Sequence, residues 1–204
     1  MNTRKVNAKQ CKMVAHRGCS GLEKENTLAA FIAAGNRSYW GVETDVHRTA
    51  DGEYVVIHDS ETGRVAGDNI VIENTSFEYI RSLRLKDIDG TRTRADLRIP
   101  TLREYIAICK KYEKNCVLEF KTVYTLEQVA EMVEIIKEEG WLEHVVFISF
   151  AYDNLLNLRK ILPGHPAQFL TGEYTDAMVE MIHKDKIDLD IYFSALDEEK
   201  IKHL

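Results

Sequence analysis

Short apolar runs alternate along this chain with segments in which apolar residues recur every three or four positions. The short runs are typical of buried strands, and the longer spacing is typical of helices with one buried face. Their alternation predicts βα units built around a parallel sheet. The runs predict seven strands, at Met13–Ala15, Val42–Val46, Tyr54–Ile57, Cys116–Phe120, Val145–Ser149, Ala167–Leu170 and Asp190–Phe193.

Polar residues mark where the intervening helices begin. Thr27, which follows Asn26, precedes an apolar segment that Gly35 is placed to end. Three further pairs have the spacing of a capping box, in which two side chains satisfy free backbone amides. These pairs are Thr75 with Glu78, Thr101 with Glu104, and Thr125 with Gln128.

Residues 60–99 interrupt this rhythm, because they contain several glycines and only one short helical segment near Phe77–Leu83. We interpret them as a small insertion after the third strand and residues 1–204 as a single domain. Parallel strands that are covered by helices predict a TIM (β/α)8-type barrel. In such barrels the functional residues lie at the C-terminal ends of the strands.

Composition limits the classes of function that the chain can have. The chain is 45% hydrophobic with a formal charge of −6, which excludes a general nucleic-acid binder. No run approaches the roughly 18 apolar residues of a membrane span, and the start lacks an apolar signal. As written, the chain is expected to be cytoplasmic, or secreted or periplasmic if a signal was removed. The four cysteines form no C-x-x-C pair and are expected to be free thiols.

Polar side chains collect at the C-terminal ends of the first four predicted strands. They are His16 and Arg17, then Glu43 and Asp45, then His58 and Asp59, then Glu119 and Lys121. Residues two apart in a strand point to the same face, so Glu43 with Asp45 project as a pair. Three carboxylates from two strands would suit a hard cation such as Mg²⁺ or Ca²⁺ better than Zn²⁺. A salt-bridge network with Arg17 and Lys121 is the alternative.

Two histidines at neighbouring strand ends indicate proton transfer near neutral pH. His16 and His58 could act as an acid/base pair on a phosphodiester, one taking a proton from the nucleophile and the other protonating the alkoxide. Nearby cations would offset charge on the phosphoryl oxygens. His47 alternates with Glu43 and Asp45, but we expect it on a loop surface.

The chain also resembles a known family, the glycerophosphodiester phosphodiesterases. The ordered segments that carry the resemblance are Val14-Ala15-His16-Arg17-Gly18 with Glu25-Asn26-Thr27-Leu28, Glu43-Thr44-Asp45-Val46 with Thr49-Ala50-Asp51-Gly52, Val55-Val56-Ile57-His58-Asp59, Ile99-Pro100-Thr101-Leu102, Leu118-Glu119-Phe120-Lys121, and Ser149-Phe150. The set spans residues 14–150, with weaker similarity beyond. No single tripeptide is specific, but the ordered set is.

The resemblance implies metal-dependent hydrolysis of a small-molecule glycerophosphodiester to sn-glycerol 3-phosphate and an alcohol, on a TIM barrel. It implies that His16 and His58 are the catalytic acid and base. The metal ligands would be Glu43, Asp45 and Glu119, and the cofactor a divalent cation, Ca²⁺ or Mg²⁺. Substrate would be bound by Arg17, Asn26 and Lys121.

The chain departs from the family pattern at its end. Strands resembling W-T-V-N and D-G-I-I-T-D are absent before Leu204, so we expect a C-terminally truncated barrel that lacks its closing strand or strands. Two alternatives stay open. One is a related lipid phosphodiesterase, similar to a lysophospholipase D, and the other is a catalytically impaired fragment that only binds ligands.

Overall fold

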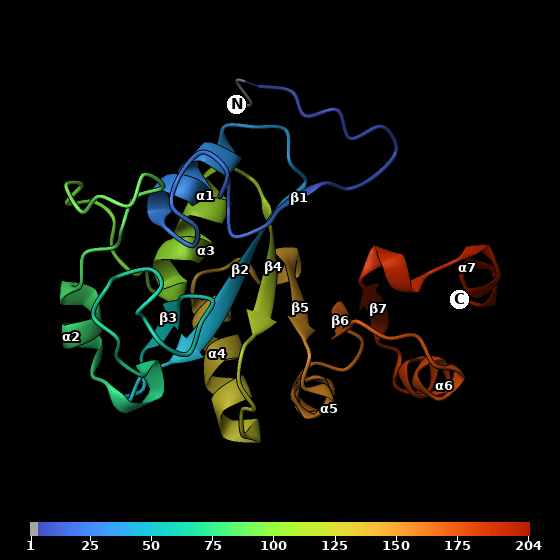
Figure 1. Cartoon of the computed structure of the whole chain (residues 1–204). Coiled ribbons are helices and arrows are strands. Elements are labelled where there is room, and N and C mark those ends of the chain that lie inside the picture. The colour runs from blue at the N-terminus through green and yellow to red at the C-terminus, as the bar shows by residue number, and fades with distance from the viewer. Residues whose placement is uncertain (1–3) are drawn as a thin grey trace.

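The structure is a computed structural model that describes residues 4–204, and a curled parallel sheet forms its centre (Figure 1). The strands are β1 (Val14–Ala15), β2 (Gly41–Arg48), β3 (Tyr54–Val56), β4 (Asn115–Phe120), β5 (Val145–Ser149), β6 (Ala167–Thr171) and β7 (Asp188–Ile191). Six of them are parallel, in the order β1-β2-β4-β5-β6-β7, and β3 pairs with β2 alone. Within residues 4–204 the sheet stays open, because β1 and β7 form its two edges.

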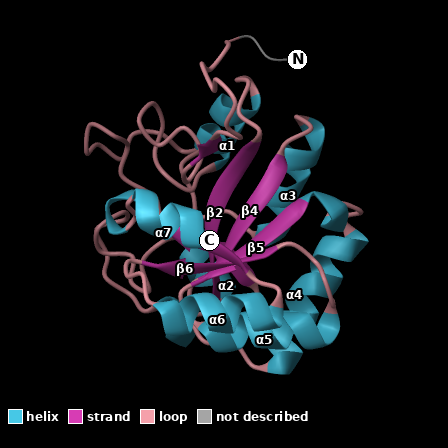
Figure 2. Ribbon diagram, turned by 90° about the vertical axis from the view of Figure 1, so that its right-hand side faces the viewer, coloured by secondary structure: helices cyan, strands magenta, loops and turns pink. Residues whose placement is uncertain are grey.

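Helices pack around the outside of the curled sheet (Figure 2). The α-helices are α1 (Leu28–Gly35), α2 (Phe77–Ser82), α3 (Leu102–Lys111), α4 (Leu126–Glu138), α5 (Tyr152–Ile161), α6 (Asp176–Asp185) and α7 (Glu198–His203). Short 3-10 helices cover Ile72–Asn74, Leu142–His144 and Phe193–Ala195. Contacts of α1 with α3, α3 with α4, and α4 with α5 continue along the sheet. Strands inside and helices outside are the layers of a TIM barrel, here over part of its circumference.

Capping side chains start these helices at most of the predicted positions. Complete capping boxes open α3 at Thr101 and α4 at Thr125, and Thr27 caps α1. The prediction for Thr75 was wrong. Its hydroxyl donates to the Val71 carbonyl oxygen at 2.7 Å, so the helix begins one residue later without a side-chain cap.

The main core fills the space between the sheet and α1, α3, α4 and α5. The Phe31 and Tyr105 rings meet edge to face at 5.0 Å, and Phe120 stacks on Phe147 at 5.3 Å. Burying one such side chain stabilises the fold by about 1.5–3 kcal/mol. This packing holds β2 and β4 rigidly side by side, and both strands carry site residues.

The third predicted strand exists, but it is not a barrel strand. The Thr49–Gly52 turn reverses the chain after β2, with Gly52 at a φ of 94°, so β3 runs antiparallel along β2. The Ile57 amide then donates to the Asp45 carbonyl oxygen at 3.0 Å. The hairpin therefore brings the chain after β3 back to the middle of β2.

Residues 60–99, the predicted insertion, share a small apolar core with Val55 of β3 and with Ile57. Its buried members are Val55, Ile57, Val65, Ala66, Ile72, Ile80, Leu83, Leu85, Leu97 and Ile99. The segment is anchored at its end as well, because the Val56 amide donates to the Pro100 carbonyl oxygen at 2.8 Å. The insertion is thus held against the same strand that leads to His58.

The last predicted strand was placed two residues too late. Lys186 adopts a left-handed conformation that ends α6, and the buried Ile187 leads directly into β7. The pairing of β6 with β7 covers residues 188–191, and Phe193 already begins a 3-10 helix. Tyr192 and Phe193, which the prediction placed in the strand, are exposed beyond its end.

Two expectations from composition agree with the structure. All four cysteines are free thiols; Cys11 is exposed and the other three are buried. No helix found between residues 4 and 204 combines the length and the apolar character that crossing a bilayer requires.

We predict that Gly18→Ala lowers the free energy of unfolding by about 2–4 kcal/mol. Gly18 has a φ of 74°, and an added Cβ would lie 2.7 Å from the Ala30 carbonyl carbon. Gly164→Ala is the matched control, because its φ is 81° with no atom within 4 Å of the new Cβ. It should cost only about 1–2 kcal/mol. Chemical denaturation measures both, and equal losses would contradict a packing role for Gly18.

Candidate active site

Three carboxylates converge inside the curled sheet, as the sequence predicted. Asp45 on β2 and Glu119 on β4 are paired across the two strands, and Glu43 lies two residues before Asp45 on the same face. One oxygen from each lies within 4.8 Å of the others, and the three residues are at most 7% exposed. Strand register alone therefore builds a buried acidic cluster, formed by Glu43, Asp45 and Glu119.

Burial and mutual repulsion make this cluster costly unless positive charge is present. Loss of solvent, and then the Asp45 carboxylate, raise the pKa of Glu43 well above its ordinary value. Burial also raises the pKa of Glu119, although Lys121 opposes this shift. An unpaired buried charge costs several kcal/mol. A cation next to the cluster would offset this cost.

Two side chains supply part of that charge. Lys121 Nζ lies 3.0 Å from Glu119 Oε1 and 3.5 Å from Asp45 Oδ1, and Arg17 Nε lies 3.4 Å from Asp45 Oδ2. The salt-bridge network considered from the sequence is therefore real. It is also incomplete, because buried Asp45 Oδ1 has no hydrogen-bond partner.

The residues present fit a divalent cation. The donors are all carboxylate oxygens, which Mg²⁺ and Ca²⁺ prefer, whereas a zinc site would bring in His or Cys. Asp45 Oδ1 has no hydrogen-bond partner, and its ion-pair partner Lys121 Nζ lies 3.5 Å away, so an additional positive charge would stabilise it. An acidic cluster and a cation site are thus compatible descriptions of the same three residues.

Backbone turns aim further groups at the cluster. Arg17 and Asn26 both have a φ of 53°, a left-handed conformation that is uncommon outside glycine. In this conformation the Arg17 amide donates to Glu43 Oε2 at 2.8 Å. The backbone of this turn therefore binds Glu43, while the Arg17 guanidinium contacts Glu25 and Asp45.

Asn26, a predicted substrate-binding residue, contacts the acidic cluster in this structure. Its Nδ2 donates to Asp45 Oδ2 at 2.7 Å, and its Oδ1 accepts from Thr44 Oγ1 at 3.0 Å. Asn26 is 3% exposed and does not line the cleft. Asn26 therefore orients the Asp45 carboxylate and is not among the residues that line the cleft.

The cluster forms the floor of a cleft of about 350 Å³. The cleft is lined by His16, Arg17, Glu43, His58, Glu119, Lys121, Ile148, Phe150, Leu170 and Asp190. Six of the eight predicted site residues therefore line one cleft, and Asp45 lies beside Lys121 and the two other carboxylates. Asp190, which was assigned to the start of the last predicted strand, also lines the cleft and was not predicted as a site residue.

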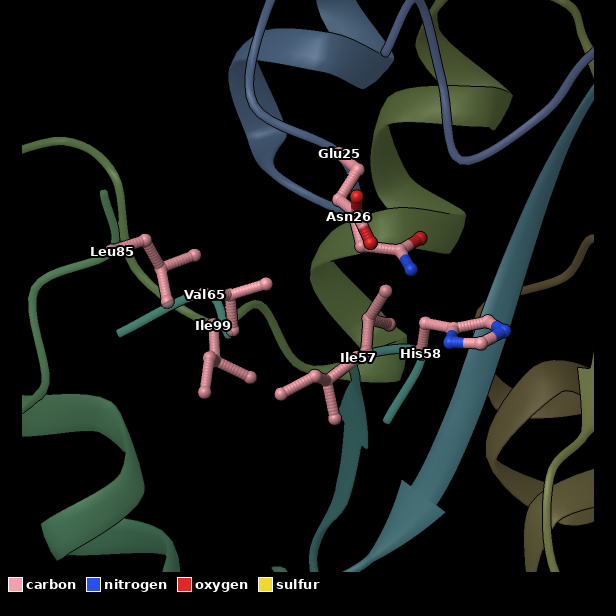
Figure 3. A pocket seen from close by; sticks show the side chains of 8 residues that line it. Glu25, Asn26, Ile57, His58, Val65, Leu85 and Ile99 are labelled. Carbon is pink, nitrogen blue, oxygen red and sulfur yellow. The ribbon is translucent and has the colours of Figure 1, made fainter. Parts of the chain in front are cut away.

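His58 reaches the cleft by a route that the sequence did not indicate. It follows antiparallel β3, so it approaches β2 from the side and not from the end of a parallel strand. Figure 3 shows its ring and the Asn26 amide pointing toward β2, with Val65, Leu85 and Ile99 of the insertion on the other side. Its Nδ1 lies 2.6 Å from Asp59 Oδ1, which leaves Nε2 for the cleft.

His16 is the more open of the two histidines. Its side chain is 69% exposed, and Nε2 lies 3.9 Å from Glu43 Oε2. Partial burial and the neighbouring Arg17 guanidinium lower the pKa of His16 below its ordinary value. The neutral imidazole, which can accept a proton, is therefore favoured near pH 7.

The prediction that His47 lies on a loop surface was wrong. It is 2% exposed, its Nδ1 lies 2.6 Å from Glu73 Oε1, and its Nε2 lies 3.2 Å from the His58 carbonyl oxygen. The strict alternation of Glu43, Asp45 and His47 was the signal for an inward side chain. Nothing in the sequence pointed to Glu73 as its partner.

Sequence comparisons with known proteins all point to one family. Residues 16–190 match the model of the glycerophosphoryl diester phosphodiesterase family. A glycerophosphodiester phosphodiesterase of Caldanaerobacter subterraneus is 32% identical over 153 residues, which cover 74% of this chain and 63% of that protein. The chain thus spans less than two thirds of that relative.

Solved structures share the fold. A phosphodiesterase of Oleispira antarctica, in complex with its product sn-glycerol-3-phosphate, superposes with a TM-score of 0.85 at 27% identity, over 94% of this chain and 79% of that one. A glycerophosphodiester phosphodiesterase of Thermotoga maritima gives 0.69 at 28% identity, over 88% and 73%.

We predict that Ca²⁺ or Mg²⁺ raises the unfolding temperature of the chain and that Glu43→Gln weakens this effect. The variant removes one of three charged ligands, so the midpoint metal concentration should rise at least about tenfold. Glu134→Gln is the control, because that carboxylate is 62% exposed and pairs only with Lys137. Thermal unfolding across a metal titration measures both, and an unchanged midpoint in Glu43→Gln would argue against the site.

Proposed function

Because the chain belongs to the glycerophosphoryl diester phosphodiesterase family, we propose that it hydrolyses glycerophosphodiesters to sn-glycerol 3-phosphate and an alcohol. The observation that carries the proposal is the single cleft in which two histidines, a lysine and an arginine stand above three buried carboxylates. The product bound to the Oleispira antarctica enzyme supports the substrate class.

In this proposal Glu43, Asp45 and Glu119 hold one Ca²⁺ or Mg²⁺ ion. When bound, the ion would offset negative charge on the phosphoryl oxygens. Arg17 and Lys121 line the same cleft and would contact the phosphate, which draws them partly away from the carboxylates. An anionic substrate is thereby held by a few local cations although the whole chain carries a charge of −6.

The two imidazoles would move the protons. One accepts the proton of the attacking hydroxyl, and the other donates a proton to the departing alkoxide oxygen. The His58 ring is oriented by Asp59, and the neutral form of His16 is favoured by its lowered pKa. Both rings border the same space, so a single bound phosphate can lie between them.

We predict that His16→Ala, His58→Ala and Glu119→Ala each reduce turnover of glycerophosphocholine by at least roughly a hundredfold, because each removes a proton-transfer group or a metal ligand. His183→Ala, an exposed position on α6, should retain activity. EDTA should abolish turnover, and added Ca²⁺ or Mg²⁺ should restore it. Turnover that survives both chelation and loss of His58 would refute the mechanism.

One observation favours a second candidate, a lipid phosphodiesterase. A neighbouring cleft of about 570 Å³ shares Phe150, Leu170 and Asp190 with the first and is also lined by exposed Tyr192 and Phe193. Such a surface could hold the acyl chain of a lysophospholipid beside the reacting phosphate.

The two substrate classes separate in one assay. If the lipid is the substrate, Phe193→Ala should lower kcat/KM for lysophosphatidylcholine about tenfold and leave glycerophosphocholine unchanged, because only the lipid places apolar atoms there. Faster turnover of glycerophosphocholine with no effect of Phe193→Ala supports the first proposal. Binding of sn-glycerol 3-phosphate without turnover of either substrate would identify a non-catalytic binding fragment.

A further inference from the structure

Arg64 lies outside the cleft, yet its side chain binds two carboxylates that themselves contact cleft residues. Its Nε donates to Asp59 Oδ2 at 2.6 Å. Its Nη1 and Nη2 donate to the two oxygens of Glu25 at 2.9 and 2.8 Å. All three guanidinium nitrogens therefore donate to these two carboxylates, and a lysine could not reproduce this geometry.

Each of these carboxylates has its second partner in the cleft. Asp59 Oδ1 lies 2.6 Å from His58 Nδ1, and Glu25 Oε1 accepts from Arg17 Nη1 at 3.1 Å. An unbroken series of contacts thus runs from the imidazole to the phosphate-facing guanidinium, with Arg64 at its midpoint. Arg17 and Glu25 come from the chain between β1 and α1, whereas His58 and Asp59 come from the chain after β3.

The insertion fixes the position of Arg64. Val65 and Ala66, the next two residues, are buried in the small core that packs on β3. Their amides both donate to the Thr62 carbonyl oxygen, at 3.0 and 2.7 Å. The backbone beside Arg64 is therefore rigid, although the Arg64 side chain itself is 46% exposed.

The charges along this series favour one hydrogen-bonding pattern. Hydrogen bonds from Arg64 lower the pKa of Glu25 and of Asp59 to about 2, so both are acceptors near neutral pH. An ionised Asp59 cannot donate, and His58 Nδ1 must then carry the hydrogen. When the His58 ring is neutral, Nε2 is therefore its unprotonated nitrogen.

We propose that Arg64 is a positioning residue that, by bridging Asp59 and Glu25, fixes the tautomer of His58 and the direction of the Arg17 guanidinium. The effect on turnover rests on the proposed function, whereas the effect on the His58 tautomer does not. Without Arg64, the Asp59 carboxylate, which is 30% exposed, is free to turn toward solvent. The His58 ring then loses the contact that selects its Nδ1–H form.

The test compares Arg64→Gln with Arg103→Gln. Arg103 also binds two carboxylates, Glu138 and Glu139, and its side chain is 44% exposed. We expect kcat for glycerophosphocholine to fall about 10–100-fold in Arg64→Gln, with a smaller change in KM, and to stay unchanged in Arg103→Gln. Exposed ion pairs add little stability, so both unfolding temperatures should stay within about 4 °C of wild type.

Nitrogen-15 NMR of the histidine rings gives a readout that is independent of turnover. His58 should be the Nδ1–H tautomer in the wild type, a mixture in Arg64→Gln, and intermediate in Arg64→Lys, whose ammonium reaches one carboxylate at a time. The proposal is overturned if Arg64→Gln and Arg64→Lys both give wild-type spectra and rates. It is also overturned if a fall in the unfolding temperature of these two variants accounts for their lost activity.

The same data separate this inference from the proposed function. If the wild-type chain turns over no glycerophosphodiester, the proposed function fails. The His58 spectra of wild type and Arg64→Gln still decide the role of Arg64 in that case. If turnover is present and the spectra are identical, the positioning role alone is wrong.

Discussion

Repulsion among three buried carboxylates is the main constraint on this site, and Arg17 and Lys121 are placed to counter it. One oxygen from each of Glu43, Asp45 and Glu119 lies within 4.8 Å of the others, and all three residues are buried beside the cleft. Two cationic side chains and a backbone amide reduce the cost, but one oxygen of Asp45 still has no hydrogen-bond partner. Buried charge clusters of this kind are concentrated at functional sites, and the proposed cation beside a phosphodiester would use this charge.

The hairpin of β2 and β3 connects the acidic cluster to His58, one of the two proposed catalytic residues. By running antiparallel along β2, β3 brings His58 to the cluster and lets the insertion pack directly behind it. The insertion is therefore part of the support of the site. Its apolar core holds Arg64 in place, and Ile57 and Ile99 lie next to His58 in the small crevice behind the cleft.

Sequence reasoning recovered most of the sheet, because apolar runs and capping residues report strands and helix starts directly. It brought the carboxylates together from the two-residue period of strands, and the register of β2 with β4 confirmed their proximity. It failed where contacts join residues far apart in sequence. His47 with Glu73, and Arg64 with Glu25, look like ordinary charged residues until the fold places them side by side. The antiparallel direction of β3 was equally hidden, since a short apolar run does not reveal its direction.

The most direct test is a crystal structure of the chain grown with Mn²⁺, located by its anomalous scattering. The account predicts one strong peak about 2.0–2.6 Å from an oxygen of each of Glu43, Asp45 and Glu119, with Lys121 Nζ moved away from the carboxylates. A structure without a peak at these residues, and with Lys121 still seated between Glu119 and Asp45, would contradict it.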